Sequence, residues 1–573
     1  MSSFSAKAWV LSPPQKSQAL HLASDYKISP LLAQLLINRR VPIEEVSQFL
    51  HPSFSQLPDP KQMLGMEEAL DRLVKAIQQQ EKITIYGDYD VDGCTSTALL
   101  MDFLTQVGAK VDYYIPHRVK EGYSLNPQAL HQLKEQGSKV IITVDNGISA
   151  IQSAQIAQEL KLDLIITDHH ELPANLPPAL AILNPKLHGP QGWGRELAGV
   201  GVAFYLAMGL RRALREQGYF KDQEPDLKQA LDLVALGTIA DMAPLRGLNR
   251  LLVKEGLKVL TSTKRPGLQA LKQVCAYTGE IKASQVAFHL GPRLNAVGRL
   301  EEASLGVELL LSQDLDQAQS LARRLDQANR DRRILESQIT EEALAKVEAE
   351  DFLQNYQSLV LLGQNWHPGV VGIVASRLVE KHYLPSIVLT QDGEYLKGSA
   401  RSIKGFSMVE ALEACSSYLS KFGGHTYAAG LSLLPEKLED FRQAFDQQVR
   451  LKLKPEDFKP SLSLDASLGL EDIHPSLMEE LKLLEPCGLG NPEAVFCLEK
   501  AQVKGARIVG EKHLKLQLVS GAHQLEAIAF GKGEDYLLPD GAWVRTAFMP
   551  QWNEWQGVER LQLRILEIKD PQA

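Results

Sequence analysis

Carboxylate and imidazole side chains gather directly after three apolar runs of the chain, ITIY, VIITV and LIIT. The residues that follow these runs are, in order, Asp88, Asp90 and Asp92; Asp145; and Asp168, His169, His170 and Glu171. One further acid, Asp241, ends the apolar stretch LDLVALGTIA. Unpaired carboxylates at this density repel one another and are costly to bury, and divalent cations would relieve that cost.

The residue types indicate which ions would bind. Asp and His ligands without Cys suit Mn²⁺ or Mg²⁺ better than structural zinc. A carboxylate shared by two such ions, about 3.5–4 Å apart, would set them up for in-line attack of water on phosphorus. Asp145 stands alone after its run, between the two clusters, so it is the predicted bridging ligand.

Simpler interpretations of these residues stay open. DYDVDG is similar to a calcium-binding loop, but Phe103 stands where such a loop needs a glutamate. Asp88 or Asp90 is also expected to cap the helix that follows. A His-His pair alone is more often an ordinary surface or core pair, although here it adjoins Asp168 and two other acidic strand ends.

Strand and helix patterns alternate around these segments and predict how the side chains are positioned. Strands are expected at 81–88, 110–118, 139–147 and 162–171, and helices at 95–108, 126–137 and 149–160. This alternation is typical of βαβ units and a parallel sheet whose apolar strands are buried on both faces. Because ligands bind outside the carboxyl ends of such strands, the three segments are expected to converge in one crevice.

The whole chain is predicted to contain five parts. They are an adapter at 1–55, a catalytic domain at 56–300, a long connecting helix at 301–352, a second α/β lobe at 353–455 and an all-β module at 456–573. The connecting helix is predicted because Glu301 to Val360 contains no Pro and only one Gly, and a pair of shorter helices is the alternative. The short alternating runs near the end indicate a small barrel such as an OB-fold.

Composition excludes several classes of protein. Hydrophobic residues make up 44% and charged residues 23% of the 573, which is ordinary globular usage. The net charge is 61 − 70 = −9, so any site for a polyanion must be a local basic patch. Five cysteines without a CxxC pair indicate a reducing, cytoplasmic location, and no apolar run has membrane-spanning length.

The motifs resemble those of the DHH phosphoesterase family, named for the triplet that stands here at 168–170. DYDVDG, VDNG, DHHE and GTIADMAPL follow in the family's order, and GPRLNAVGRL, WHPGVVGIVASRL, GSARS, GGHTYAAG and EPCGLGNPE are similar to motifs of its single-strand exonuclease branch. The resemblance implies a two-lobed α/β DHH core with a parallel sheet, a long connecting helix and a C-terminal OB-fold β-barrel. It also implies 5′→3′ degradation of single-stranded DNA to mononucleotides, with two divalent ions (Mn²⁺ or Mg²⁺), in recombination and repair.

The resemblance also implies roles for individual residues. One metal would be held by Asp88 and Asp145, and the other by Asp90, Asp145, His169 and Asp241. His170 would contact the scissile phosphate. The remaining two acids, Asp92 and Asp168, would fix the loop and orient the ligands.

Other residues are implied to hold the DNA strand. They are Arg118, Tyr123, Arg293, Asn295, Arg299, Ser399, Arg401 and His425. Arg293 and Arg299 suit a phosphate clamp, because arginine offers a two-pronged donor, and pairing with Glu301 or Glu302 is the alternative.

The flanking motifs PHRVKEGYS and GSARS would form a pocket for the 5′-terminal phosphate, to which they contribute Arg118 and Tyr123, and Ser399 and Arg401. Tyr123 could equally be a core residue, and His425 could simply start a helix.

The implied partner is single-stranded DNA with a 5′ end, gripped without regard to base sequence and therefore salt-sensitively. A single-strand-binding protein and a RecQ-type helicase are further implied partners, and the implied state is a monomer. The first rival is a DHH phosphodiesterase of short oligonucleotides or cyclic dinucleotides. The second is a non-enzymatic relative that has lost its metals, which the presence of every predicted ligand argues against.

Overall fold

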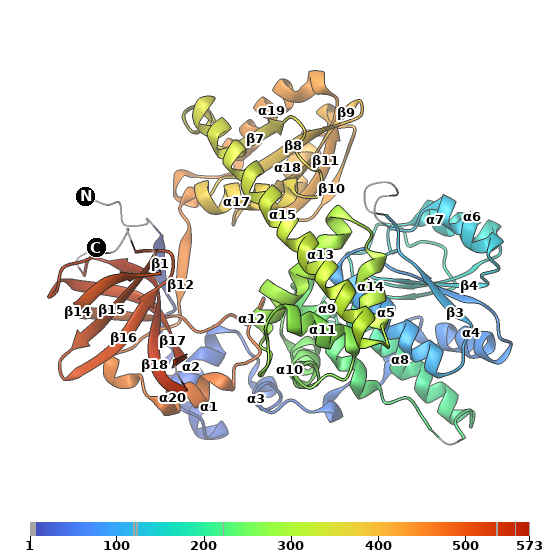
Figure 1. The fold of residues 1–573 in the computed structure, drawn as a ribbon, viewed down its shortest axis with the longest axis horizontal. Coiled ribbons are helices and arrows are strands. Elements are labelled where there is room, and N and C mark those ends of the chain that lie inside the picture. The colour runs from blue at the N-terminus through green and yellow to red at the C-terminus, as the bar shows by residue number, and fades with distance from the viewer. Residues whose placement is uncertain are drawn as a thin grey trace. The chain divides into compact units, whose positions relative to one another are not determined.

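The computed structural model describes residues 7–117, 121, 124–221, 223–510, 512–533, 537–555 and 557–571. The chain forms two compact units, each described here by itself (Figure 1). The first unit comprises 15–329 and 476–493. The second unit comprises 1–14, 330–475 and 494–573.

A five-stranded parallel sheet organises the first unit. Its strands are β2 (Ile83–Tyr86), β3 (Val111–Tyr114), β4 (Val140–Val144), β5 (Asp163–Thr167) and β6 (Ala181–Leu183). They are ordered β3-β2-β4-β5-β6, and every neighbouring pair is parallel. The predicted parallel sheet is therefore confirmed. The strand order reverses direction at β2 and β4, and such a switch point leaves a crevice at the carboxyl ends of the two strands.

Helices cover both faces of this sheet. Apolar side chains of α4 (Met66–Gln78), α5 (Val91–Gln106) and α8 (Gly199–Glu216) pack with Ile85 and Ile142 in one core. On the opposite face, α6 (Pro127–Glu135) and α7 (Ile151–Glu159) pack against Tyr86, Ile141 and Ile166. Burial on both faces explains why these strands are continuously apolar. Other α-helices of this unit include α1 (Lys16–Tyr26), α2 (Pro30–Asn38), α3 (Val46–Leu50), α9 (Leu231–Ala240), α10 (Gly247–Thr261), α11 (Pro266–Val274), α12 (Ala283–Gln285), α13 (Gly291–Leu300), α14 (Ser304–Leu311) and α20 (Pro475–Lys482).

The helix expected to run through 301–352 is shorter than predicted. A separate helix, α14, ends at Leu311, and the 35-residue α15 (Leu315–Ala349) begins in the first unit and ends in the second. The break has a local cause, because the carboxylate of Asp314 accepts the backbone N–H of Gln317 at 2.7 Å and so caps a new helix.

The second unit contains an α/β lobe built on a five-stranded sheet. Its strands are β7 (Leu359–Gly363), β8 (Ser386–Asp392), β9 (Tyr395–Arg401), β10 (Lys421–Gly424) and β11 (Ala428–Leu433), in the order β10-β11-β9-β8-β7. The β7–β8 pair is parallel and the others are antiparallel. The C-terminal part of α15 and α17 (Val371–His382) pack in one core, and α18 (Met408–Ala414) and α19 (Leu438–Lys452) belong to another.

A closed barrel completes the second unit. Its strands are β14 (Phe496–Val509), β15 (His513–Ser520), β16 (His523–Ala529), β17 (Trp543–Trp555) and β18 (Val558–Lys569). Pairing runs β14-β15-β16-β18-β17 and returns to β14, which confirms the predicted OB-type barrel. Beside it lie β1 (Ala8–Leu11), paired with β12 (Ser461–Leu464), and β13 (Ala466–Ser467). Within the described ranges, no helix is long and apolar enough to cross a membrane.

Candidate metal centre

The loop after β2 places Asp88 and Asp90 at the switch point of the parallel sheet. Asp90 caps α5, because its carboxylate accepts the backbone N–H of Gly93 at 3.0 Å, as one of the two acids was expected to do. A side chain at Gly93 would approach the Asp88 carbonyl oxygen to 2.6 Å. The glycine therefore lets the loop fold tightly enough to bring both acids to one edge of the sheet.

Asp145 directly follows β4 and has a left-handed backbone conformation, with φ of 64°. Its backbone N–H is held by the Thr167 carbonyl at 3.0 Å. Non-glycine residues adopt this conformation infrequently, and it is a recurrent feature of functional sites. It turns the buried carboxylate out of the strand, so that Oδ1 lies 3.0 Å from Nε2 of His169.

Asp92 is anchored by residues that sequence reasoning missed. Its two carboxylate oxygens accept the backbone N–H groups of Gly199 (2.6 Å) and Val200 (2.8 Å), at the start of α8. The positive end of a helix dipole stabilises a buried carboxylate there. This contact supports the positioning role implied for Asp92. The sequence feature that could have indicated this contact is the run of small residues AGVGV at 198–202, which lets another segment approach the backbone closely.

The histidine pair after β5 is oriented by Asp168. One oxygen of Asp168 contacts His170 Nδ1 at 2.8 Å and accepts both following backbone N–H groups, while the other accepts the N–H of Ile148. Asp168 therefore fixes the orientation of the His170 ring through Nδ1. His169 directs Nε2 at three carboxylates, with Asp145 at 3.0 Å, Asp92 at 3.8 Å and Asp241 at 3.9 Å.

These side chains form three overlapping groups whose ligand atoms all lie within 4.8 Å of one another. The groups are Asp88, Asp90 and Asp145; Asp145, His169 and His170; and Asp92, His169 and Asp241. All predicted metal ligands are thus brought together, although Asp90 groups with Asp88 rather than with Asp241 and His169. Asp145 belongs to two groups, as a bridging ligand would.

The donor set fits divalent cations. Asp145 Oδ1 and His169 Nε2 are buried and have no hydrogen-bond partner in the described structure, although they lie 3.0 Å apart. Buried polar atoms are rarely left unsatisfied in proteins. Asp241 is also unfavourably placed in the absence of a cation, because it follows the C-terminus of α9, where the helix dipole disfavours negative charge. Oxygen and imidazole ligands suit Mn²⁺ or Mg²⁺.

Burial and mutual repulsion shift the pKa values at this centre. Burial raises the pKa of Asp145 well above its ordinary value, and the charges of Asp92 and Asp90 add to the rise. Burial and Asp92 act in the same way on the pKa of Asp241, and burial with Asp90 raises the pKa of Asp92 to about 7. Burial lowers the pKa of His169 to about 3, which leaves its imidazole in the neutral form that binds metals.

The metal-free protein is therefore expected to lose stability as the pH rises from 5.5 to 7.5. Three carboxyls and His170, all with raised pKa values, hold protons in the folded state that the unfolded state has released. The lowered pKa values of His169, His367 and His382 have the opposite effect, which fades above the ordinary histidine pKa of 6.5. The net fall in the free energy of unfolding is roughly 1–2 kcal/mol per pH unit. Thermal unfolding in EDTA would show it, Mn²⁺ should remove it, and Asp145→Asn should flatten it. A melting temperature that rises over this interval in EDTA would contradict the electrostatic account.

Gly199→Ala is expected to weaken Mn²⁺ binding about 10–100-fold, the effect typical of disturbing groups that orient metal ligands. A methyl group at position 199 would lie 2.8 Å from Oδ1 of Asp145, so the carboxylate or α8 must move. The matched control is Gly201→Ala on the same helix, whose methyl group would lie nearest to the flexible side chain of Leu197, at 3.0 Å. Calorimetric titration with Mn²⁺ distinguishes the two, and equal affinities would refute this packing argument.

The predicted strand-binding residues of the first unit have other contacts. Arg293 forms an ion pair with Asp326 at 2.8 Å and donates to the His289 carbonyl. It therefore has a carboxylate partner, as the alternative to a phosphate clamp required, but the partner is neither Glu301 nor Glu302. Asn295 accepts the backbone N–H of Val91 at 3.3 Å and so ties α13 to the start of α5. Arg299 lies on α13.

Three further predicted residues lie in the second unit. Ser399 and Arg401 are on β9 and converge on Gly372 in the first turn of α17, where a Cβ would lie 3.2 Å from Ser399 Oγ and 3.1 Å from Arg401 Nη2. His425 is exposed in the turn between β10 and β11. Arg118 and Tyr123 lie outside the described residues.

Comparison with family models gives three matches along the chain. The DHH family N-terminal domain matches residues 82–238, the DHHA1 domain matches 354–451, and the RecJ OB domain matches 464–567. The first match contains most of the acid and histidine cluster, and the third contains the barrel.

Whole-chain relatives carry one name. The single-stranded-DNA-specific exonuclease RecJ of Bacillus subtilis is 42% identical over 97% of this chain and 70% of its own, and that of Escherichia coli is 38% identical over 95% and 96%. Among solved structures, RecJ of Thermus thermophilus with Mn²⁺ aligns with a TM-score of 0.85 at 32% identity, over 99% of this chain and 80% of that one. The same protein has been solved with Mg²⁺, with a TM-score of 0.79 at 32% identity over 99% of this chain and 79% of that one.

Proposed function

Because this chain belongs to the RecJ family of single-stranded-DNA-specific exonucleases, we propose that its acid and histidine cluster hydrolyses single-stranded DNA from the 5′ end. The protein is a metal-dependent single-stranded-DNA exonuclease of the DHH class with Mn²⁺ or Mg²⁺ as cofactor, and its family acts in DNA recombination and repair. The observation that carries the proposal is the buried pair of unsatisfied ligand atoms on Asp145 and His169 at the switch point of the sheet.

The ligands of the two ions are proposed from their grouping. Asp88, Asp90 and Asp145 would hold one ion. His169 would hold the other, with Asp145 (3.0 Å from its Nε2) and Asp241 (3.9 Å). When bound, the ions polarise the phosphodiester and make a water molecule more acidic. Asp92 would keep the loop after β2 against α8 through its two backbone hydrogen bonds.

His170 is proposed to contact the scissile phosphate. Burial alone would lower its pKa, but the hydrogen bond and charge of Asp168, together with Asp90 and Asp88, raise it on balance. When protonated, the ring can donate from Nε2 to a phosphate oxygen while Asp168 holds Nδ1. This donation would stabilise the negative charge that develops on the phosphoryl group.

The 5′-terminal phosphate is proposed to bind beside the first turn of α17. Ser399 and Arg401 supply a hydroxyl and a guanidinium there, and a helix N-terminus attracts anions. Arg118 and Tyr123, which lie outside the described residues, are proposed to bind the DNA strand. Arg293, Asn295, Arg299 and His425 are proposed to contact the strand, which requires Arg293 to exchange its bond with Asp326 for one with phosphate.

Arg401→Ala is expected to lower the preference for a 5′-phosphorylated over a 5′-hydroxyl strand about 10-fold, because one charge-assisted contact is worth about 1.5–3 kcal/mol. The measurement is kcat/KM on matched oligonucleotides that differ only in the end group. Lys397→Ala, on the same strand and paired with Asp392, serves as the control. An unchanged preference would place the end pocket elsewhere.

The remaining proposals concern the cell. A single-strand-binding protein and a RecQ-type helicase are proposed as partners, and a monomer as the working state. A cytoplasmic location is proposed because all five cysteines are free thiols. We also propose the boundaries of the five parts of the chain, namely the adapter, the catalytic domain, the connecting helix, the second lobe and the barrel.

Digestion of long single-stranded DNA, labelled at either end, tests the proposed function. With Mn²⁺, the 5′ label should appear first as mononucleotide, while duplex DNA stays intact. Early release from the 3′ label would reverse the proposed polarity. Cleavage of a dinucleotide alone would support the rival phosphodiesterase of short oligonucleotides or cyclic dinucleotides.

A further inference from the structure

Strand β7 is an edge of the α/β sheet in the described part of the second unit, with β8 as its neighbour. The N–H of Leu359 donates to the Pro385 carbonyl, and the register pairs Leu361 with Val388. Because neighbouring residues of a strand point their backbone groups in opposite directions, those of Val360 and Leu362 face away from β8. Such outward groups form a template for another strand.

One side chain already satisfies part of this edge. Arg442, from α19, donates Nε and Nη2 to the Val360 carbonyl, each at 3.1 Å, while its Nη1 binds Glu439. Arg442 also lies over the Phe352 ring at 5.0 Å, which fixes its position. The first half of the edge, at Val360, is thus closed by Arg442 of α19. The second half, at Leu362, is not bonded by Arg442.

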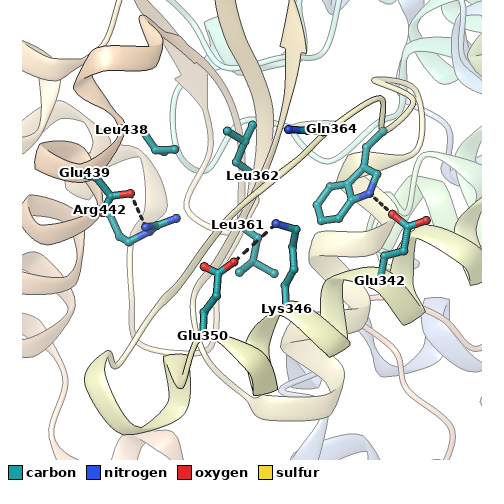
Figure 2. Close-up of a pocket in the computed structure, with 10 residues that line it drawn as sticks. Glu342, Lys346, Glu350, Leu361, Leu362, Gln364, Leu438, Glu439 and Arg442 are labelled. Atoms are coloured by element: carbon teal, nitrogen blue, oxygen red, sulfur yellow. Dashed lines mark hydrogen bonds and ion pairs between the residues drawn. The ribbon is translucent and has the colours of Figure 1, made fainter.

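A groove of about 540 Å³ runs beside this second half, as Figure 2 shows. Its volume lies within the range of about 300–1,000 Å³ that is usual for ligand sites. Leu361, Leu362 and Leu438 provide apolar surface along it. Lys346, on α15, and Glu350, directly after its last residue, reach in on the other side (Figure 2).

The charges along the groove favour a cationic occupant. Three carboxylates line it, Glu342, Glu350 and Glu439, against two cations. Both cations are already engaged, since Lys346 lies 3.6 Å from Glu350 and Arg442 lies 2.6 Å from Glu439. Glu342 accepts only an indole N–H, from Trp366 at 2.7 Å, and so keeps an uncompensated charge among the described contacts.

We propose that the β7 edge, between α15 and α19, binds an extended basic peptide segment of a partner protein. The peptide would add a strand beside Leu362, place apolar side chains against Leu438 and Leu362, and direct a Lys or Arg side chain to Glu342. Backbone pairing along an edge strand provides affinity, and the flanking side chains provide selectivity. The proposal is independent of the DNA chemistry, because none of these residues belongs to the acid and histidine cluster.

The test uses the full chain and a fluorescein-labelled octapeptide of alternating lysine and valine. Leu362→Pro removes the outward N–H without changing charge, and proline is tolerated at outward-facing positions of edge strands. Fluorescence anisotropy should show saturable binding that Leu362→Pro weakens at least about 10-fold, whereas Leu362→Val, which keeps the N–H, has little effect. Glu342→Gln should weaken binding about threefold, the value of an exposed ion pair.

Two further peptides keep the test decisive. N-methylation of alternate amides blocks strand pairing without altering the protein, and should abolish binding even if Leu362→Pro fails to fold. A glutamate–valine peptide should not bind. The proposal is overturned if the lysine peptide does not bind the wild-type chain, binds Leu362→Pro equally well while that variant retains wild-type nuclease activity, or tolerates N-methylation. Loss of chain self-association on adding the peptide would also overturn it, in favour of a second copy as occupant.

Discussion

Asp145→Asn is expected to reduce kcat for single-stranded DNA by at least about 10³-fold, or roughly 4 kcal/mol of transition-state stabilisation. Among the described residues, Asp145 is the one carboxylate that belongs to two ligand groups, one with Asp88 and one with His169. Its Oδ1 has no hydrogen-bond partner in the same part of the chain. An amide at this position cannot supply the negative charge that two adjacent cations require. Single-turnover digestion in saturating Mn²⁺ measures the effect.

Binding of the DNA strand should survive this substitution, because the proposed phosphate contacts lie on other residues. The matched control is Asp112→Asn on β3, which removes a carboxylate paired with Lys82 at 2.6 Å rather than one in the cluster. That variant should retain nearly normal turnover. Near-normal turnover of Asp145→Asn would instead rule out the bridging role.

His170→Gln is expected to lower kcat about 10²-fold while the chain still binds Mn²⁺, because removing one donor to a developing phosphoryl charge has effects of this size. His170 is held by Asp168 through Nδ1, and its ring is the proposed donor to the scissile phosphate. His169→Gln should behave differently and lose metal affinity, since His169 Nε2 faces three carboxylates.

Parallel measurements of kcat and Mn²⁺ affinity separate the two histidines. Equal loss of metal binding in both variants would show that His170 is a ligand rather than a substrate contact. His170 is close enough to the cluster for a role as a ligand, because Asp145, His169 and His170 also have ligand atoms within 4.8 Å of one another. The two measurements therefore decide between the two roles.

Much of the centre could be predicted from the sequence because parallel strands impose a simple rule. Apolar runs buried on both faces end at one edge of the sheet, so the acids after β2, β4 and β5 had to meet there. Asp88, Asp145 and Asp168 follow this rule, and the capping by Asp90 follows from its place before α5.

Contacts between distant segments could not be predicted in the same way. The clamp on Asp92 comes from the backbone of Gly199, 107 residues away, and backbone donors leave no mark in residue type. The partner of Arg293 is Asp326, on the next long helix, rather than an acid beside it in sequence. The helix break before α15 could not be predicted either, because residue type alone does not show whether Asp314 caps a helix or lies inside one.

The number of Mn²⁺ ions bound per chain tests the central claim most directly. Electron paramagnetic resonance and calorimetry on the metal-depleted protein should find two ions per chain. At saturation, their spectrum should be that of a coupled pair, since two ions sharing one carboxylate lie about 3.5–4 Å apart. A single ion per chain, or two with the spectrum of isolated Mn²⁺, would contradict a centre bridged by Asp145.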